Sequence, residues 1–255
     1  MIFDSHVHSS FSTDSNMKIT DAIKSAKKQN VGIIITDHMD LNYPSGVGFR
    51  FNPTEYFAEY LKYRNDSLLI GIEIGMSESC KEENKKIIDN FNFDQVIGSQ
   101  HTLNDMDISF PKLYKNTPYR NILESYFSEI TNSILSHSYI DTLGHIDYIS
   151  RYAPVNDSEI YYLHYGDLID KVLKTCISTN TVMEINTRRI GNIDSFNNLK
   201  LIYSRYKELG GKYVTIGSDS HNPKSINNNF KDAINLCELC SLKPIYFKNR
   251  KPEFF

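Results

Sequence analysis

A regular alternation of two kinds of segment constrains the fold of this chain more than any other feature. Short apolar runs rich in β-branched residues span 2–4, 32–36, 68–73, 95–99, 142–145, 182–186 and 213–218. Longer amphipathic stretches follow them at 20–29, 54–64, 82–91, 119–136, 158–177, 199–209 and 225–239. Seven strand–helix units in this order predict an α/β fold with a parallel sheet and helices packed outside it.

Local signals support several of the predicted helix ends. Pro53 and Thr54 precede one helix, Pro118 begins another, and Gly210 with Gly211 ends the segment 199–209. No linker, charge block or low-complexity stretch divides the 255 residues, so we expect a single domain over 1–255. A doubly wound open sheet and a closed barrel both fit the alternation itself.

Composition excludes several classes of protein. The 28 Lys and Arg against 31 Asp and Glu give a net charge of −3, which argues against a dedicated DNA-binding protein. No apolar run is long enough to span a membrane, and the first ten residues lack the pattern of a secretory signal. Four scattered cysteines do not make a disulfide scaffold, and we interpret the pair Cys237 and Cys240 as reduced thiols on a helix. We therefore expect a cytoplasmic protein.

Potential metal ligands stand at the carboxyl ends of six of the seven predicted strands. They are His6 and His8 after the first strand, His38 after the second, Glu73 on the third, His101 after the fourth, His145 on the fifth, and Asp219 with His221 after the seventh. Asp14 lies in the loop after the first strand. The carboxyl ends of barrel strands converge on one mouth, whereas an open sheet would spread these residues along an edge. The pattern therefore favours a barrel with a metal site at its mouth.

The types of ligand indicate which ions and how many. Imidazole and carboxylate without cysteine suit zinc, which we expect first, with iron or manganese as alternatives. The candidates exceed the needs of one ion, so we expect two or three divalent metal ions, with Glu73 as the natural bridge. His137 and His164 fall inside predicted helices, and we interpret them as structural or surface residues.

The motifs at these strand ends resemble those of the polymerase and histidinol phosphatase (PHP) family. They are H-x-H at 6–8, T-D-H at 36–38, G-I-E at 71–73, G-S-Q-H-T at 98–102, G-H-I-D at 144–147, E-I-N-T at 184–187 and S-D-x-H at 218–221. The resemblance implies a distorted (β/α)7 TIM-like barrel with a trinuclear metal site. It is closest to the members that hydrolyse L-histidinol phosphate to L-histidinol and phosphate in histidine biosynthesis, and it implies that small phosphorylated substrate.

The resemblance also implies how the ligands are shared among the ions. His6, His8, Glu73 and Asp219 would hold the first ion; Glu73, His101 and His145 the second; and Asp14, His38 and His221 the third. Some members of the family have histidine where this chain has Asp14. An oxygen donor at that position makes the third site harder and bears on the identity and occupancy of its metal.

The expected mechanism is direct attack by a metal-bound hydroxide on phosphorus, without a phospho-enzyme. Paired metals lower the pKa of bound water and hold the phosphate oxygens for in-line attack. We expect catalytic roles for Asp219, which could accept the proton of the water, and for Arg151 and Arg188, whose guanidinium groups suit phosphate. Arg189 is an alternative to Arg188 for this contact.

Two other functions fit parts of the pattern. One is a nuclease or nucleotide phosphodiesterase with the same metal architecture, which the lack of a basic surplus disfavours. The other is a non-catalytic metal-binding regulatory module, which would more often use closed tetrahedral Cys and His sites. We therefore expect neither a nucleic-acid nor a membrane partner, and the sequence leaves the oligomeric state open.

Overall fold

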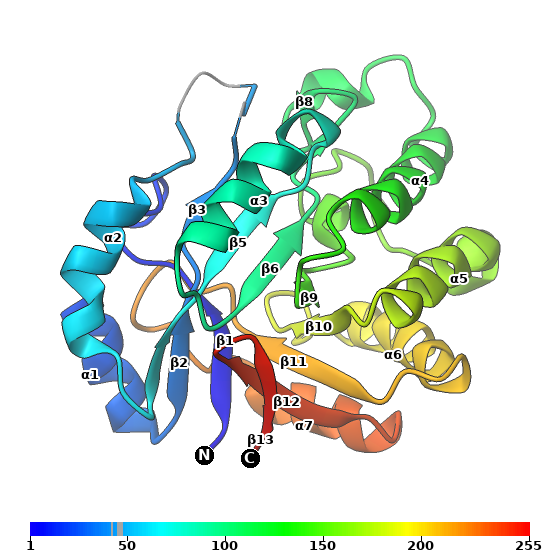
Figure 1. Ribbon diagram of the computed structural model, residues 1–255. Helices are drawn as coiled ribbons and strands as arrows, with labels where there is room; N and C mark the ends of the chain where they lie inside the picture. Colours follow the sequence, from blue (N-terminus) through cyan, green and yellow to red (C-terminus); the bar gives the residue numbers. More distant parts are fainter. Residues whose placement is uncertain (42, 45–47) are drawn as a thin grey trace.

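The strands of this protein surround a common centre, and most of its helices lie outside them (Figure 1). The computed structural model describes residues 1–41, 43–44 and 48–255. The strands that build the ring are β1 (Phe3–Val7), β2 (Gly32–Ile35), β3 (His38–Met39), β4 (Leu68–Ile70), β5 (Ile72–Gly75), β6 (Val96–Ser99), β9 (Thr142–Leu143), β10 (Val182–Asn186) and β11 (Tyr213–Gly217). A small antiparallel pair, β7 (Thr102–Leu103) and β8 (Met106–Asp107), lies outside the ring order.

The ring consists of two parallel sheets rather than one continuous ladder. The predicted strand 68–73 divides into β4 and β5, and β3 follows just beyond the predicted strand 32–36. β2 pairs with β1 and β4 pairs with β2, whereas β3 and β5 belong to the larger sheet with β6, β9, β10 and β11. A parallel bridge between Val7 and Ser220 brings the end of β1 beside the segment that follows β11. Asp4 of β1 strengthens this junction, because its carboxylate accepts hydrogen bonds from the backbone and hydroxyl of Ser218 and from the backbone of Asn227. The result is a distorted barrel, as predicted.

Seven helices accompany the strands in the described part of the chain. They are α1 (Ile19–Gln29), α2 (Pro53–Tyr60), α3 (Lys81–Asn90), α4 (Tyr119–Ser136), α5 (Tyr162–Ser178), α6 (Ile193–Glu208) and α7 (Phe230–Leu239). Short 3-10 turns include η4 (Tyr148–Arg151), which follows β9 and carries a predicted site residue. Proline at the first position of α2 and a side-chain cap from Asn52 explain why this helix begins where the sequence indicated.

Three helices begin more than one residue away from the predicted position, two of them for a local reason. Helix α6 begins at residue 193 instead of 199, because the side chain of Asn192 accepts hydrogen bonds from two amides of the first turn. Helix α7 begins at 230 instead of 225, because Asn227 and Asn229 adopt left-handed backbone conformations that a continuous helix cannot contain. Helix α5 begins at 162 instead of 158. Gly210 has a φ of 113° and ends α6 close to the predicted position.

The amino ends of the strands are covered by a hairpin that the sequence did not predict. Strands β12 (Lys243–Lys248) and β13 (Lys251–Phe254) pair antiparallel, and β12 extends the larger sheet beyond β11. The ring of Tyr246 in β12 stacks on Phe3 at a centroid distance of 4.0 Å, beside buried Ile34 and Leu69. The two termini therefore lie near each other at this end (Figure 1), and an apolar cluster fills the barrel beneath the mouth.

Candidate metal centre

All nine predicted ligands belong to one connected cluster at the carboxyl ends of the strands. Each lies on or directly after a strand of the ring, apart from Asp14 in the loop that follows β1. His38 begins β3, Glu73 lies in β5, and the remaining ligands lie in β1 or follow β1, β6, β9 and β11. The convergence of these ends explains how residues more than 200 positions apart come within a few ångströms of each other.

Glu73 is the centre of the cluster. Its Oε2 lies 3.3 Å from Nε2 of His6, 3.4 Å from Nε2 of His8 and 2.9 Å from Nδ1 of His38. Its Oε1 lies 3.3 Å from Nε2 of His101 and 3.0 Å from Nε2 of His145. The two carboxylate oxygens thus face two different sets of imidazoles, which is the arrangement that a bridging ligand requires.

Four of the histidines are oriented through Nδ1, which leaves Nε2 directed into the cluster. His6 donates to Glu184 at 2.7 Å, His101 donates to Asp40 at 2.7 Å, and His221 donates to the carbonyl of Asp219 at 3.0 Å. His8 donates to the hydroxyl of Ser12 at 2.9 Å. An acceptor on one ring nitrogen fixes the tautomer that presents a lone pair on the other nitrogen, as metal-binding histidines require.

The tautomer of His8 is fixed by the hydroxyl of Ser12, which Asp37 in turn orients. The hydroxyl proton of Ser12 goes to Asp37 at 2.6 Å, so its oxygen is free to accept from Nδ1 of His8. The same oxygen also accepts from the backbone of His38 at 3.1 Å. Asp37, which directly precedes His38, therefore connects the loop after β1 to the start of β3.

Several buried polar atoms in the cluster have no hydrogen-bond partner within the described residues. They include Nε2 of His6, Nε2 of His8, Nδ1 of His38, Oε2 of Glu73 and Nδ1 of His145. A buried polar atom without a partner costs about 1–3 kcal/mol, and native proteins keep few of them. Here lone pairs of imidazole face oxygens of carboxylates at 3.3–3.4 Å. Such acceptor pairs need a cation between them, so the donor set fits divalent metal ions.

The pKa values of these groups also show that the cluster attracts positive charge. Burial opposes protonation of His101, yet the carboxylates of Asp40 and Glu73 outweigh it and raise its pKa to about 9. Burial would raise the pKa of Glu73, but His6, His38 and His101 hold it well below its usual range. The carboxylates of the cluster are therefore strong binding partners for cations.

Asp14, His38 and His221 form the outer edge of the cluster. Oδ2 of Asp14 lies 3.1 Å from Nε2 of His221 and 3.7 Å from Nε2 of His38, and its side chain is 43% exposed. The ring of His8 stacks on that of His221 at 4.1 Å and connects this edge to the centre. The ligand atoms of His8, His38 and His221 lie within 4.8 Å of one another, as do those of His6, His8 and Asp219.

The three predicted arginines have different surroundings. The side chain of Arg151 is only 7% exposed, and it donates to Oδ2 of Asp219 at 2.5 Å and to the side-chain oxygen of Asn186 at 2.9 Å. The side chain of Arg188 is 48% exposed, and its nearest ionic partner is Asp219 at 3.7 Å. Arg189 instead pairs with Asp147 and Glu159. Arg188 is therefore available to a ligand at the mouth, whereas Arg189 is already engaged away from it.

Two carboxylates that orient the histidines were not predicted from the sequence. Asp40 lies two residues after His38 in T-D-H-M-D, and its ligand atoms group with those of His38 and His101. Glu184 lies inside β10, within a motif that was noted only for its resemblance. A spacing of two residues on an extended segment was a usable signal for Asp40. No local signal pairs Glu184 with His6, which lies 178 positions away.

Two glycines make room for these carboxylates. A Cβ on Gly75 would lie 2.1 Å from Oδ1 of Asp40, and a Cβ on Gly217 would lie 2.4 Å from Oε1 of Glu184. Neither distance can be accommodated without moving a group that orients a histidine. The tertiary structure therefore explains, on steric grounds, why glycine stands at positions 75 and 217 near the predicted ligands.

The other predictions for histidine and cysteine concern residues away from the cluster. His137 caps the end of α4, where its Nδ1 contacts the carbonyl of Ser133, and His164 is exposed on α5. Cys237 and Cys240 are buried thiols at the end of α7.

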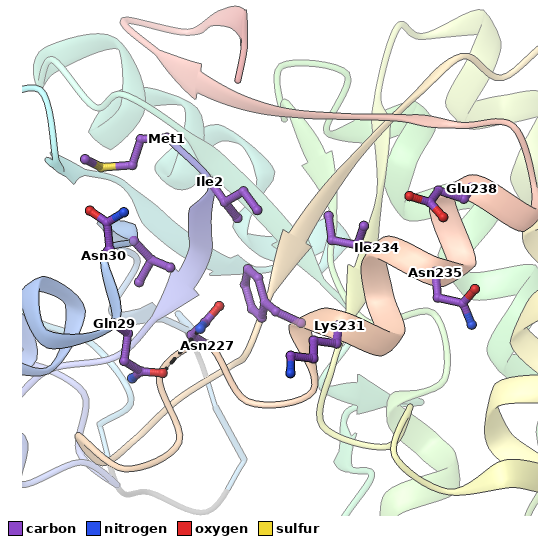
Figure 2. A pocket seen from close by; sticks show the side chains of 11 residues that line it. Met1, Ile2, Gln29, Asn30, Asn227, Lys231, Ile234, Asn235 and Glu238 are labelled. Atoms are coloured by element: carbon purple, nitrogen blue, oxygen red, sulfur yellow. Dashed lines mark hydrogen bonds between the residues drawn. The ribbon is translucent and has the colours of Figure 1, made fainter.

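A cavity of about 610 Å³ between α1 and α7, at the amino end of β1, lies beside Met1, Ile2 and Ile234 (Figure 2). None of the predicted site residues is among the described residues that line it.

The fold and this cluster are those of a known family. The family model described as the PHP domain matches residues 4–188, which covers most of the barrel and all but two of the predicted metal ligands. The chain therefore belongs to the PHP domain family. Asp219 and His221 lie beyond the matched residues, although β11 places them in the cluster.

Individual relatives narrow the comparison. A probable histidinol-phosphatase of Clostridium acetobutylicum is 51% identical over 250 residues, which cover 98% of each chain. The histidinol-phosphatase of Lactococcus lactis is 29% identical over 86% of this chain and 83% of its own.

Solved structures agree with the sequence relatives. A crystal structure of histidinol phosphate phosphatase from Lactococcus lactis, complexed with zinc, L-histidinol and phosphate, has a TM-score of 0.92 and 27% identity, and covers 99% of this chain and 98% of its own. A chain in a structure of archaeal ribonuclease P with mature tRNA shares only the fold, at 12% identity and a TM-score of 0.51. The predicted distorted barrel is thus confirmed by an overlay of almost the whole chain.

Proposed function

We propose that this protein is a metal-dependent phosphomonoesterase that hydrolyses L-histidinol phosphate to L-histidinol and phosphate. The observation that carries the proposal is the set of oriented histidines whose free Nε2 atoms face Glu73 and Asp219 at the mouth of the barrel. The 51% identical relative has the name of this activity, and the structural relative binds both products. The substrate is therefore a small phosphorylated amino alcohol of histidine biosynthesis.

Two or three divalent ions, zinc first, would be held by the nine clustered residues. We assign His6, His8, Glu73 and Asp219 to one ion, Glu73, His101 and His145 to a second, and Asp14, His38 and His221 to a third. Support comes from the two-sided surroundings of Glu73, and from the contacts of Asp14 with His38 and His221. Bound divalent ions supply a Lewis acid for phosphate oxygens and lower the pKa of water that attacks phosphorus.

The residues of the chain position the phosphate and the protons. Arg188 is the most accessible of the three arginines, and its guanidinium suits the bidentate recognition of a phosphate oxygen pair. Arg151 holds Oδ2 of Asp219, which leaves Oδ1 directed toward His8 at 3.3 Å. We infer that Asp219 takes a proton from the attacking water and returns it to the alcohol oxygen of the substrate, whose bond to phosphorus breaks as the bond between the water oxygen and phosphorus forms.

Two further properties belong to the same proposal. We treat residues 1–255 as one domain, because a single large core cluster extends from Val7 to Leu242. We place the protein in the cytoplasm, because Cys176, Cys237 and Cys240 are free thiols, as is usual in a reducing compartment. No helix of the described residues has the length and apolar character needed to cross a membrane.

A substrate panel with purified, zinc-loaded protein tests the function. The panel contains L-histidinol phosphate, nucleoside monophosphates, a cyclic dinucleotide and a short oligonucleotide. We expect kcat/KM for L-histidinol phosphate to exceed that for the other phosphomonoesters by about 100-fold or more, which corresponds to about 2.7 kcal/mol of transition-state discrimination. Equal rates on all monoesters would refute the specific substrate, and faster cleavage of the oligonucleotide would favour a nuclease. Retained activity in the double variant His101→Ala with Glu73→Ala would refute the metal site.

A further inference from the structure

Strand β10 is the one strand of the predicted seven that contributes no metal ligand, yet two of its side chains reach the centre. Glu184 and Asn186 are two positions apart, so they point to the same side of the strand. Both side chains are buried, with exposures of 1% and 4%. Buried polar residues at the end of a strand that contributes no metal ligand are candidates for a role in the site.

Glu184 connects two of the clustered histidines. Its Oε1 accepts from Nδ1 of His6 at 2.7 Å, and its Oε2 accepts from the backbone of His145 at 2.8 Å. A carboxylate on Nδ1 both fixes the imidazole ring and makes Nε2 a stronger donor to a metal. Gly217 leaves the space that this carboxylate occupies. Glu184 therefore acts on the cluster through His6 without facing Glu73 itself.

Asn186 connects Glu184 to the arginines. Its amide donates to Oε2 of Glu184 at 3.1 Å. Its side-chain oxygen accepts from the guanidinium of Arg151 at 2.9 Å and from the backbone of Arg188 at 3.1 Å. Because an amide has one acceptor and one donor end, Asn186 is suited to stand between a carboxylate and two cationic residues.

We propose that Glu184 and Asn186 are a pair of positioning residues. They fix the metal-binding histidines and the phosphate-binding arginine relative to each other. Glu184 orients His6 toward the metal. Asn186 orients Arg151 toward Asp219 and fixes the backbone of Arg188. The continuous path runs from His6 through Glu184, Asn186 and Arg151 to Asp219. This inference rests on the proposed function, because it assigns Arg188 to the phosphate of the substrate.

The variants Glu184→Gln and Asn186→Leu of the full chain test metal binding and phosphate binding separately. Zinc affinity of the metal-depleted protein is measured by competition with a chromophoric chelator, and the inhibition constant of inorganic phosphate is measured with the zinc-loaded protein. We expect Glu184→Gln to weaken zinc binding by about 10- to 100-fold. We expect Asn186→Leu to raise the phosphate inhibition constant and KM by about 10-fold, with a smaller change in kcat and zinc affinity within about threefold, because a hydrogen bond to a charged group is lost.

Glu159→Gln is the matched control, because Glu159 also pairs with an arginine on this side of the barrel but contacts Arg189 instead of the cluster. It should leave zinc affinity and phosphate inhibition unchanged. Wild-type zinc affinity in Glu184→Gln would overturn the role of Glu184, and an unchanged phosphate constant in Asn186→Leu would overturn that of Asn186.

A measurement on the wild type covers the case in which a variant does not fold. The Nδ1 proton of His6 should give a downfield, slowly exchanging NMR signal in the zinc-loaded protein, and its absence would overturn the contact with Glu184. Zinc affinity does not depend on the substrate, so a failure of the proposed function is visible separately as no turnover of L-histidinol phosphate by the wild type.

Discussion

The two ends of the barrel both bury carboxylates, but the described residues supply hydrogen-bond donors more completely at one end than at the other. At the amino end, Asp94 accepts from the guanidinium of Arg64 at 2.6 and 2.8 Å and from the backbone amides of Ile70 and Asn249 at 2.9 Å. Asp141 at the same end accepts from Val96 and Arg250. At the carboxyl end, Oε2 of Glu73 has no hydrogen-bond donor among the described residues.

This difference distinguishes a structural ion pair from a binding site. A carboxylate with complete partners stabilises the fold, and its loss leaves donors unpaired. A carboxylate surrounded by imidazole lone pairs is stable only with a cation that the chain does not supply. We therefore expect substitutions at the amino end to reduce stability, and substitutions at the carboxyl end to reduce activity and metal binding.

The largest effect is expected for Glu73→Gln. The amide removes the charge that faces five histidines, so the several kcal/mol of transition-state stabilisation that metal ions provide is lost. We expect kcat/KM for L-histidinol phosphate to fall by about a thousandfold or more, together with a loss of bound zinc by elemental analysis. His164→Ala, an exposed histidine outside the cluster, is the control and should retain both. Wild-type zinc content in Glu73→Gln would contradict the bridging role.

The opposite outcome is expected for Asp94→Ala at the amino end. The substitution leaves Arg64 and two backbone amides without their acceptor, and we expect a loss of about 3–5 kcal/mol in the free energy of unfolding. Denaturation in urea measures this change, and kcat of the remaining folded protein should stay near the wild-type value. Asp66→Ala removes an exposed partner of Lys248 and should leave stability close to that of the wild type. A large loss of kcat in Asp94→Ala would break the comparison.

Asp4 lies between the two ends and tests what burial does when all the donors are neutral. Burial raises its pKa from 3.8 to about 6 against the hydrogen bonds from Ser218 and Asn227. Because the folded state binds this proton more tightly than the unfolded state, its contribution to stability falls as pH rises from about 4 to 6. The raised pKa corresponds to about 3 kcal/mol.

The free energy of unfolding of Asp4→Asn should therefore rise by up to about 3 kcal/mol relative to that of the wild type between pH 4 and pH 6. This change is independent of any difference in stability between the two proteins at pH 4. Urea denaturation at fixed zinc concentration across this range measures the difference. A difference that stays constant with pH would contradict the raised pKa of Asp4.

The smallest effect is expected for Arg188→Ala at the mouth. Arg188 is half exposed and lies 3.7 Å from Asp219 in a long ionic contact, so its loss should leave stability nearly unchanged. We expect KM for L-histidinol phosphate to rise by about 10- to 100-fold, or about 1.4–2.7 kcal/mol of binding, with zinc content unchanged. Arg189→Ala, which breaks contacts with Asp147 and Glu159, should instead lower stability and leave KM within about threefold. The reverse pattern would assign the phosphate contact to Arg189.

The sequence by itself determined the strands and which side chains stand at their carboxyl ends. Short apolar runs and motifs such as T-D-H and G-H-I-D are local, and they located the strands of the ring other than the short β3 and every residue of the cluster's predicted ligand set. Local patterns also placed most of the helices, with errors where asparagine caps or left-handed asparagines moved a boundary.

Only the tertiary structure decided how these residues are supported. The pairing of His6 with Glu184, of His101 with Asp40 and of Arg189 with Glu159 joins segments that are distant in sequence, and each depends on which strands become neighbours. The hairpin β12–β13 and the need for glycine at 75 and 217 follow from the same packing. Periodicity along a chain reports the face on which a side chain lies, whereas its partner across the barrel is fixed only when the ring closes.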